Sequence, residues 1–176
     1  MYISSSKLID EVGELLKGGV ADVFSTMLGL QVQNIATEDI RDNGEIFVAA
    51  SVAFVGDVHG IVYLYFKSSI ARTLAGRLLG LSEEDLTDDS IVGDAIGELS
   101  NMIVGAAQSR LCDSGIPCTL TVPIVTHGQD IKEEVSFPAD NLLMCVACCD
   151  EVIQLELIMK SSQKPSVISE TYEQNS

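Results

Sequence analysis

Four residues near the middle of the chain have types and a spacing that would form a polar stripe on one helix. They are Asp94, Glu98, Asn101 and Gly105, at positions i, i+4, i+7 and i+11 of the segment DAIGELSNMIVG. At roughly 100° per residue, these positions lie within about 60° of one another around a helix. The apolar residues of the same segment take another face; they are Val92, Ala95, Ile96, Leu99, Ile103 and Ala106. One face of this helix can therefore anchor it while the other contacts a partner.

Asn101 is the residue of this stripe that could act on a phosphoryl group. A carboxamide donates one hydrogen bond and accepts another, so it can hold a water molecule in line with a phosphorus atom without changing its own protonation. A glutamine does this in GTP hydrolysis. A Glu and an Asn on a solvated helix face are ordinary by themselves, and that plain interpretation stands as the alternative. The three glycines at 93, 97 and 105 lower helix propensity, so local stability does not explain this composition.

The pattern Asp/Ser-xxx-Glu-xx-Asn-xxx-Gly resembles the signature of the CheC/CheX/FliY phosphatases, and all four positions are filled as that family fills them. The resemblance implies an enzyme that dephosphorylates a CheY-type response regulator in chemotaxis signalling. Asn101 would orient the attacking water, and Glu98 would pair with a lysine of the receiver. Asp94 and Gly105 would bind the partner, Gly105 by leaving room for its backbone. The chain itself would bind no cofactor, because the receiver supplies the divalent cation, Mg²⁺.

A weak internal repeat extends this resemblance over most of residues 7–162. The segment 11–18 aligns with 98–105 without a gap, and 65–69 aligns with 158–162. In the first copy, Lys7 stands in the place of Asp94 and Glu14 in the place of Asn101. An ionised carboxylate cannot donate a hydrogen bond and would bring negative charge toward a phosphoryl group. We therefore expect the first copy to be catalytically silent, which leaves one active motif in the chain. In having a single motif, the chain resembles the CheX type within the family.

Hydrophobic periodicity predicts an α+β fold with two long helices packed on one face of an antiparallel sheet. The resemblance implies that this fold is the CheC-like pseudo-twofold repeat. We expect one domain over residues 1–162 and a polar, flexible tail over 163–176. Small residues on one flank of the motif helix, Gly93 and Gly97 among them, would let the first helix approach it closely. The predicted helices cover 8–27, 68–79 with Ser68 or Ser69 as cap, and the motif helix after an acidic linker at 82–90; the predicted strands cover 31–35, 45–54, 61–66, 118–126, 134–137, 142–149 and 152–160.

Composition limits the classes of partner. Ten basic residues against 26 acidic ones give a formal charge of −16, which disfavours both nucleic acid and anionic lipid as partners. No apolar run approaches the roughly 20 residues that span a bilayer, and the start of the chain does not have the pattern of a secretory signal. We therefore expect a cytoplasmic protein. The five cysteines are expected to be small core residues, because Cys145 and Cys148 of the CxxC lie in a predicted strand and would point to opposite faces.

Three classes of function remain open. The first is the phosphatase, acting on a phosphorylated CheY-type response regulator. The second is a non-catalytic binding module of similar fold, like the middle domain of the flagellar switch protein FliM. The third is a dimerisation domain in a larger signalling assembly. We also expect a homodimer, because the apolar strands predicted at 45–54 and 142–149 would invite pairing if they lay at a sheet edge.

Overall fold

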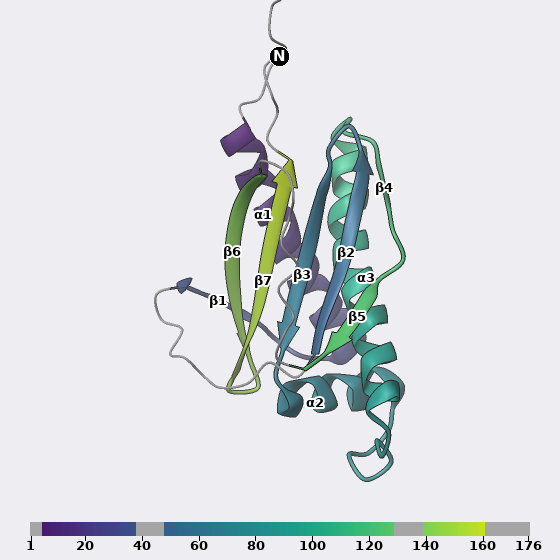
Figure 1. Cartoon of the computed structure of the whole chain (residues 1–176). Helices are drawn as coiled ribbons and strands as arrows, with labels where there is room; N and C mark the ends of the chain where they lie inside the picture. The colour runs from purple at the N-terminus through teal and green to yellow at the C-terminus, as the bar shows by residue number, and fades with distance from the viewer. Residues whose placement is uncertain (1–4, 38–47, 129–138, 161–176) are drawn as a thin grey trace, which may run out of the picture.

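The computed structural model describes residues 5–37, 48–128 and 139–160, and Figure 1 shows helices behind one antiparallel sheet. The fold is thus α+β with the long helices on one face of the sheet, as predicted. The elements in chain order are α1 (Ser5–Val23), the π-helical turn η1 (Phe24–Leu28), β1 (Gln33–Ile35), β2 (Val48–Gly56), β3 (Gly60–Phe66), α2 (Ser68–Leu79), α3 (Asp89–Asp113), β4 (Cys118–Leu120), β5 (Ile124–His127), β6 (Ala139–Cys148) and β7 (Glu151–Lys160).

The sheet interlocks the two sequence repeats. Its order is β1-β6-β7-β3-β2-β4, with β5 also paired to β2, and every pairing is antiparallel. The hairpins β2–β3 and β6–β7 meet at the centre through β3 and β7. The short strand of each repeat pairs with the hairpin of the other repeat, β1 with β6 and β4–β5 with β2. Neither half can complete its sheet alone, so the repeats form one folding unit.

The register at the centre of the sheet carries the same pseudo-symmetry. Ile158 follows Tyr65 by 93 residues in the repeat alignment. That shift places Val62 on Leu155 and Leu64 on Leu157. In the sheet, Val62 pairs with Leu157 and Leu64 pairs with Leu155, so the repeat relation turns each of these pairs into the other. The weak repeat in the sequence therefore corresponds to a pseudo-twofold axis between β3 and β7.

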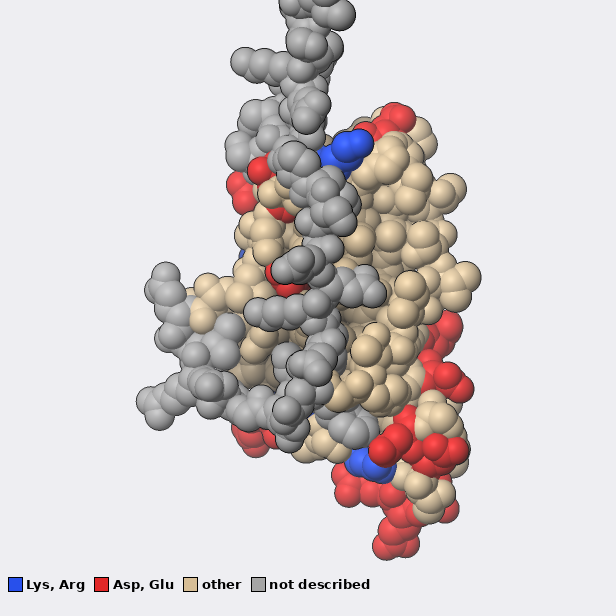
Figure 2. Space-filling view, in the orientation of Figure 1, with Lys and Arg blue, Asp and Glu red and all other residues tan. Residues whose placement is uncertain are grey.

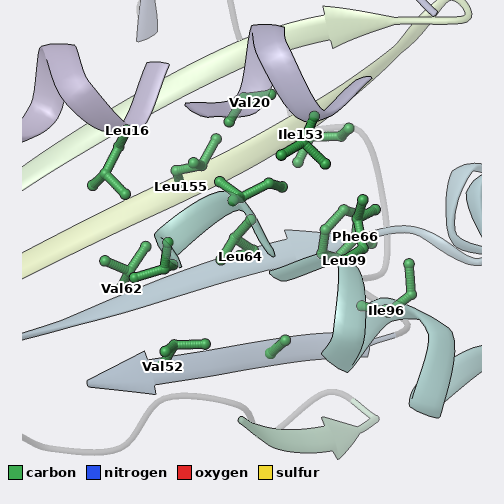
Figure 3. Close-up of a cluster of buried hydrophobic side chains, with 14 of the residues drawn as sticks. Leu16, Val20, Val52, Val62, Leu64, Phe66, Ile96, Leu99, Ile153 and Leu155 are labelled. Carbon is green, nitrogen blue, oxygen red and sulfur yellow. The ribbon is translucent and has the colours of Figure 1, made fainter. Parts of the chain in front are cut away.

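The two long helices lie against the same face of the sheet and run antiparallel to each other (Figure 1). Their apolar faces and the strands beneath form one core. Figure 3 shows Leu16 and Val20 of α1 and Ile96 and Leu99 of α3 over side chains from the strands, among them Leu64. This placement follows from helical spacing of apolar residues on both helices, because each must bury its stripe against another apolar surface.

The helix ends agree with their sequence signals in two cases and differ in one. Gly29 has a φ of 65° and its N–H bonds to the carbonyl of Phe24, so it closes η1 in the left-handed conformation that glycine favours. Asp88 caps α3 by accepting from the N–H of Ser90, a bond that lowers the pKa of this carboxyl. The cap of α2 is Lys67, without a side-chain bond, so the prediction of Ser68 or Ser69 was wrong. The motif helix begins at Asp89, inside the predicted linker.

The predicted strand 118–126 is divided into β4 and β5. From the pair Phe54–Leu120 to the pair Ser51–Ile124, β2 advances by three residues and the facing segment by four. One extra residue is therefore inserted opposite β2. This is the geometry of a β-bulge. Pro123 lies in the gap and has no N–H to donate to the ladder, while the Thr121 hydroxyl accepts from the N–H of Ala53 at 3.0 Å.

Two further predictions need correction. The cysteines are not all in the core, because Cys149 is exposed and Cys112 is half-buried. The strand predicted at 45–54 is no sheet edge: β2 lies between β3 and the β4–β5 segment. The strand predicted at 134–137, the start of that at 45–54 and the tail from 163 lie outside the described residues. Within the described part, no helix has the length and hydropathy needed to cross a bilayer.

Candidate functional site

The polar stripe lies on the outer face of α3. Asp94 and Glu98 are exposed, and Asn101 and Gly105 are partly exposed. Five of the six apolar positions on the other face are buried in the core, Ala106 being half-buried. The four residues of the stripe are thus held by one rigid helix of 25 residues. The structure places them as the spacing predicted.

The segment that carries β4 and β5 lines one side of this stripe. A Cβ at Gly97 would lie 3.0 Å from Cγ2 of Val125, and one at Gly93 would lie 2.7 Å from Nε2 of His127. One turn beyond Asn101, the nearest atom to a Cβ at Gly105 would be Cδ1 of Leu120, at 3.9 Å. Asn101 therefore lies on the helix between two contacts with this segment, which accounts for its partial burial.

The flank of small residues serves a different purpose from the one predicted. Gly93 and Gly97 let α3 approach β5, not α1, so that prediction was wrong for these two residues. The close approach of the two helices occurs instead at Gly19, where a Cβ would lie 2.7 Å from the carbonyl oxygen of Ile103. Repeated small residues signal close packing, but they do not tell whether a helix or a strand is the neighbour.

The polar side chains of the α3 stripe are free within the described part of the chain. Asp94, Glu98 and Asn101 make no side-chain hydrogen bond or ion pair there. An exposed carboxylate and an amide with both its donor and its acceptor unused are available to a partner. A Cβ at Gly105 would make only an ordinary van der Waals contact, with Cδ1 of Leu120 at 3.9 Å, so a partner backbone can come close to the helix at this point.

The matching stripe on α1 is occupied by its own neighbours. Glu11 lies 3.7 Å from Lys7, and Oε1 of Glu14 accepts from Nζ of Lys17 at 2.8 Å. At Gly18, the counterpart of Gly105, a Cβ would lie 2.5 Å from Nη1 of Arg110. The same guanidinium forms an ion pair with Asp22 and so bridges the two helices. The first copy has lost both the free polar groups and the open position.

Acidic residues surround the start of α3. Figure 2 shows Asp and Glu gathered at the lower end of the molecule, where the connection from α2 to α3 lies. The exposed residues there are Glu83, Glu84, Asp85, Asp88 and Asp89. Asp94 and Glu98 continue this negative surface along the helix. Such a surface favours a partner that presents cations next to its reactive group.

The described residues hold no group of three or more His, Cys, Asp or Glu side chains placed to bind a metal ion. The CxxC residues lie on opposite faces of β6, as predicted: Cys148 packs in the main core, while Cys145 is paired with Gln154 across the strand. Sequence reasoning did not find two features that shape the site: the β4–β5 segment beside Asn101, and the Arg110 side chain over Gly18. The first depends on how α3 packs against the strands that follow it, and the second on a contact between α1 and α3, which are distant in sequence.

Comparisons with known proteins show the family of this chain and confirm its CheC-like fold. The family model described as chemotaxis phosphatase CheX matches residues 48–148, which include the whole of α3. A CheX from Desulfovibrio desulfuricans is similar in structure, with a TM-score of 0.70 at 23% identity over 85% of this chain and 99% of that one. A CheX from Vibrio vulnificus gives 0.72 at 19% identity, covering 85% and 97%.

A third similar structure is the CheX–CheY–BeF3–Mg²⁺ complex from Borrelia burgdorferi, with a TM-score of 0.69 at 18% identity over 85% of this chain and 97% of that one. A search of curated proteins gave no sequence match. At these identities the solved structures show the shared fold, and the family model, which covers more than half of the chain, shows the family. This chain belongs to the CheX family of chemotaxis phosphatases.

Proposed function

We propose that this protein hydrolyses the aspartyl phosphate of a CheY-type response regulator, with α3 as its single catalytic element. Asn101 orients the attacking water, and Glu98 pairs with the lysine beside the receiver's phosphorylated aspartate. Asp94 and Gly105 complete the contact surface. The reaction takes place in the cytoplasm, and the chain contributes no metal of its own.

The observation that carries this proposal is the contrast between the two stripes. Within the described part of the chain, the carboxylate and the amide on α3 are free, and a Cβ at Gly105 would meet no atom closer than 3.9 Å. On α1 the corresponding carboxylates are paired with lysines, and the glycine is covered by Arg110. A surface that kept only a structural role would have no reason to leave one copy free and close the other.

The chemistry divides between the two proteins. The receiver brings the phosphoryl group, a divalent cation and a lysine; the CheX of the Borrelia complex is described with CheY, BeF3 and Mg²⁺. Asn101 accepts a hydrogen bond from the water and donates one toward a phosphoryl oxygen, so the water oxygen stays in line with phosphorus. Because the amide stays neutral throughout, the rate should not depend on its titration.

The test is the rate of phosphate release from a phosphorylated CheY-type receiver, measured with and without this protein. We expect Asn101→Ala to lower kcat by about 100-fold or more, since positioning is lost, while KM changes little because a shortened side chain leaves the docking surface intact. Asn34→Ala, at an exposed asparagine on β1, is the matched control and should keep full activity. An Asn101→Ala variant with near wild-type hydrolysis would refute the mechanism.

A second arm of this experiment concerns the cation. Chelation should stop the reaction, and Mg²⁺ added back should restore it, because the receiver carries the ion that neutralises phosphoryl charge. Metal analysis of the purified protein alone should find no stoichiometric ion. Full activity in chelator would contradict the division of labour between the two proteins.

The competing function is a binding module without hydrolysis, or a dimerisation domain. The free amide of Asn101 favours the enzyme, because a module that only binds would not need an unused donor and acceptor beside an open glycine. The same assay separates them. Binding to the phosphorylated receiver without any acceleration of its dephosphorylation would establish the module.

A further inference from the structure

The turn between β6 and β7 has an unusual backbone for its residues. Cys149 and Asp150 have φ values of 52° and 63°, the only positive φ values at non-glycine residues in the described part of the chain. Cys148 pairs with Glu151 across the hairpin, so these two residues form a two-residue loop. Such loops favour Asn-Gly or Asp-Gly, because most side chains are strained at positive φ. A cysteine at this position therefore calls for an explanation beyond the turn itself.

The explanation lies in the neighbouring side chain. The Sγ atoms of Cys148 and Cys149 are 3.6 Å apart, so the two thiols are in direct contact. Cys148 is buried, with 3% of its surface exposed, and Cys149 is exposed. Both line a depression of about 230 Å³ whose other walls are Gln31, Gln33, Ala147 and Asp150. A small molecule from solution can reach the exposed thiol at this depression.

We propose that Cys148 and Cys149 form a reversible oxidation site, closed to a disulfide within the turn by exchange with a low-molecular-weight disulfide. The Cys149 thiolate attacks one sulfur of the small disulfide, forms a mixed disulfide and releases one small thiolate. Cys148 then gives its proton to solvent and attacks Sγ of Cys149, releasing the second small thiolate. Two protein thiols are oxidised, and one small disulfide is reduced to two thiols.

The order of these two steps follows from burial. Burial raises the pKa of the Cys148 thiol to about 11, and its hydrogen bond with Cys149 adds to the effect. Cys148 therefore keeps its proton, and the exposed thiol makes the first attack. The second attack is intramolecular between sulfurs already in contact, which offsets the low thiolate fraction of Cys148.

The product should be easily reduced. Adjacent Cα atoms are about 3.8 Å apart across a trans peptide, below the range of about 4.4–6.8 Å usual for cystine. The closed ring is therefore strained, as in labile rather than structural disulfides. The change remains local, because the next residue, Glu151, is held by Ser69 Oγ at 2.8 Å and Lys67 Nζ at 3.2 Å.

The experiment uses oxidised glutathione as the probe and the full chain with Cys112 and Cys118 both changed to serine. That background removes the other two cysteines that lie close to each other: Sγ of Cys112 is 3.7 Å from the carbonyl oxygen of Cys118. After incubation and acid quenching, the intact mass should be lower by two hydrogens, without a retained glutathione. The remaining thiols are alkylated only afterwards, for peptide mapping. Peptide mapping should locate both oxidised sulfurs at Cys148 and Cys149, and dithiothreitol should restore the original mass.

Two variants in the same background separate the roles. Cys148→Ser should stop at the mixed disulfide, keeping one glutathione on Cys149. Cys149→Ser should react at least about tenfold more slowly, because the remaining thiol is buried and protonated. A glutathione adduct that persists on Cys149 with Cys148 intact would overturn the proposal. So would the absence of reaction, or a disulfide that involves Cys145.

Discussion

Glu98 and Glu14 have the same charge on equivalent helices but different neighbours. Glu14 is held by Lys17 one turn away, whereas Glu98 has no ion pair within the described part of the chain. At the scale of single residues, the site is therefore defined by which polar groups remain unpaired as much as by which residue types are present. A free carboxylate can exchange its water for a partner's cation, while a paired one must first give up its lysine.

This difference predicts the effect of reversing the charge of Glu98. Glu98→Lys should raise KM for the phosphorylated receiver by about tenfold or more, because two cations would then face each other in the contact. The value of kcat at saturation should fall less. Asp57→Lys makes the same charge change in the exposed turn between β2 and β3, outside the acidic surface at the start of α3, and should leave KM nearly unchanged. Equal effects from both variants would show that only the overall charge matters.

The first copy gives the complementary prediction. Glu14→Gln supplies the missing amide on α1, but Arg110 still covers Gly18, so no receiver can approach as it would on α3. Receiver hydrolysis should therefore stay at the wild-type rate. Thermal unfolding serves as the control, because an exposed isosteric change usually shifts stability by no more than about 0.5 kcal/mol. A loss of activity as large as that of Asn101→Ala, with unchanged melting temperature, would make α1 a working site.

At the scale of elements, the packing of α1 on α3 sets where the stripe points. The two backbones approach closely at Gly19, which is buried and faces the carbonyl of Ile103. Gly18, its neighbour, faces only the tip of the Arg110 side chain. The two glycines thus differ in whether the atom in front of them can move.

We expect these glycines to respond differently to alanine. Gly19→Ala must displace a helix backbone and should lower the free energy of unfolding by about 1–3 kcal/mol. Gly18→Ala only displaces a flexible guanidinium, and the better helix propensity of alanine, about 1 kcal/mol, offsets the loss of a surface ion pair worth up to about 1 kcal/mol. Urea unfolding of both variants measures this. Equal losses would contradict the idea that the backbone contact at Gly19 is less tolerant than the side-chain contact at Gly18.

The elements also show what the sequence could and could not predict. Helical spacing located α1 and α3 and the outward face of Glu98, because burial of an apolar stripe leaves a helix one orientation. The alternation of apolar and polar residues located the strands of the hairpins β2–β3 and β6–β7. The sequence did not predict the division at Pro123, because a bulge depends on the register with β2. It did not identify the neighbour of Gly93, because the space beside a glycine can be filled by a strand as well as by a helix. The roles of Asn101 and Glu98 in hydrolysis remain predictions.

At the scale of the whole molecule, the interlocked sheet leaves its two edges in different states. On one edge, the bulge between β4 and β5 interrupts the ladder, which is a common protection against pairing. On the other edge, β1 covers only Cys145, Val146 and Ala147 of β6. Among the described residues, no strand pairs with the outer side of the remaining length of β6, from Ala139 to Met144. The edge that could accept a second chain is therefore that of β6, not of β2.

We expect this edge to form a twofold homodimer, which would present one active α3 from each chain. Light scattering at micromolar concentration should give twice the chain mass of 18.8 kDa. Leu143 is 42% exposed on β6, and Leu143→Lys should shift the mass toward the monomer, since lysine on an edge strand opposes pairing. Val122→Lys, at a residue 83% exposed beside β4, is the control and should leave the dimer intact. A wild-type mass near 18.8 kDa would rule the dimer out, and dissociation by Val122→Lys alone would move the interface to the opposite edge.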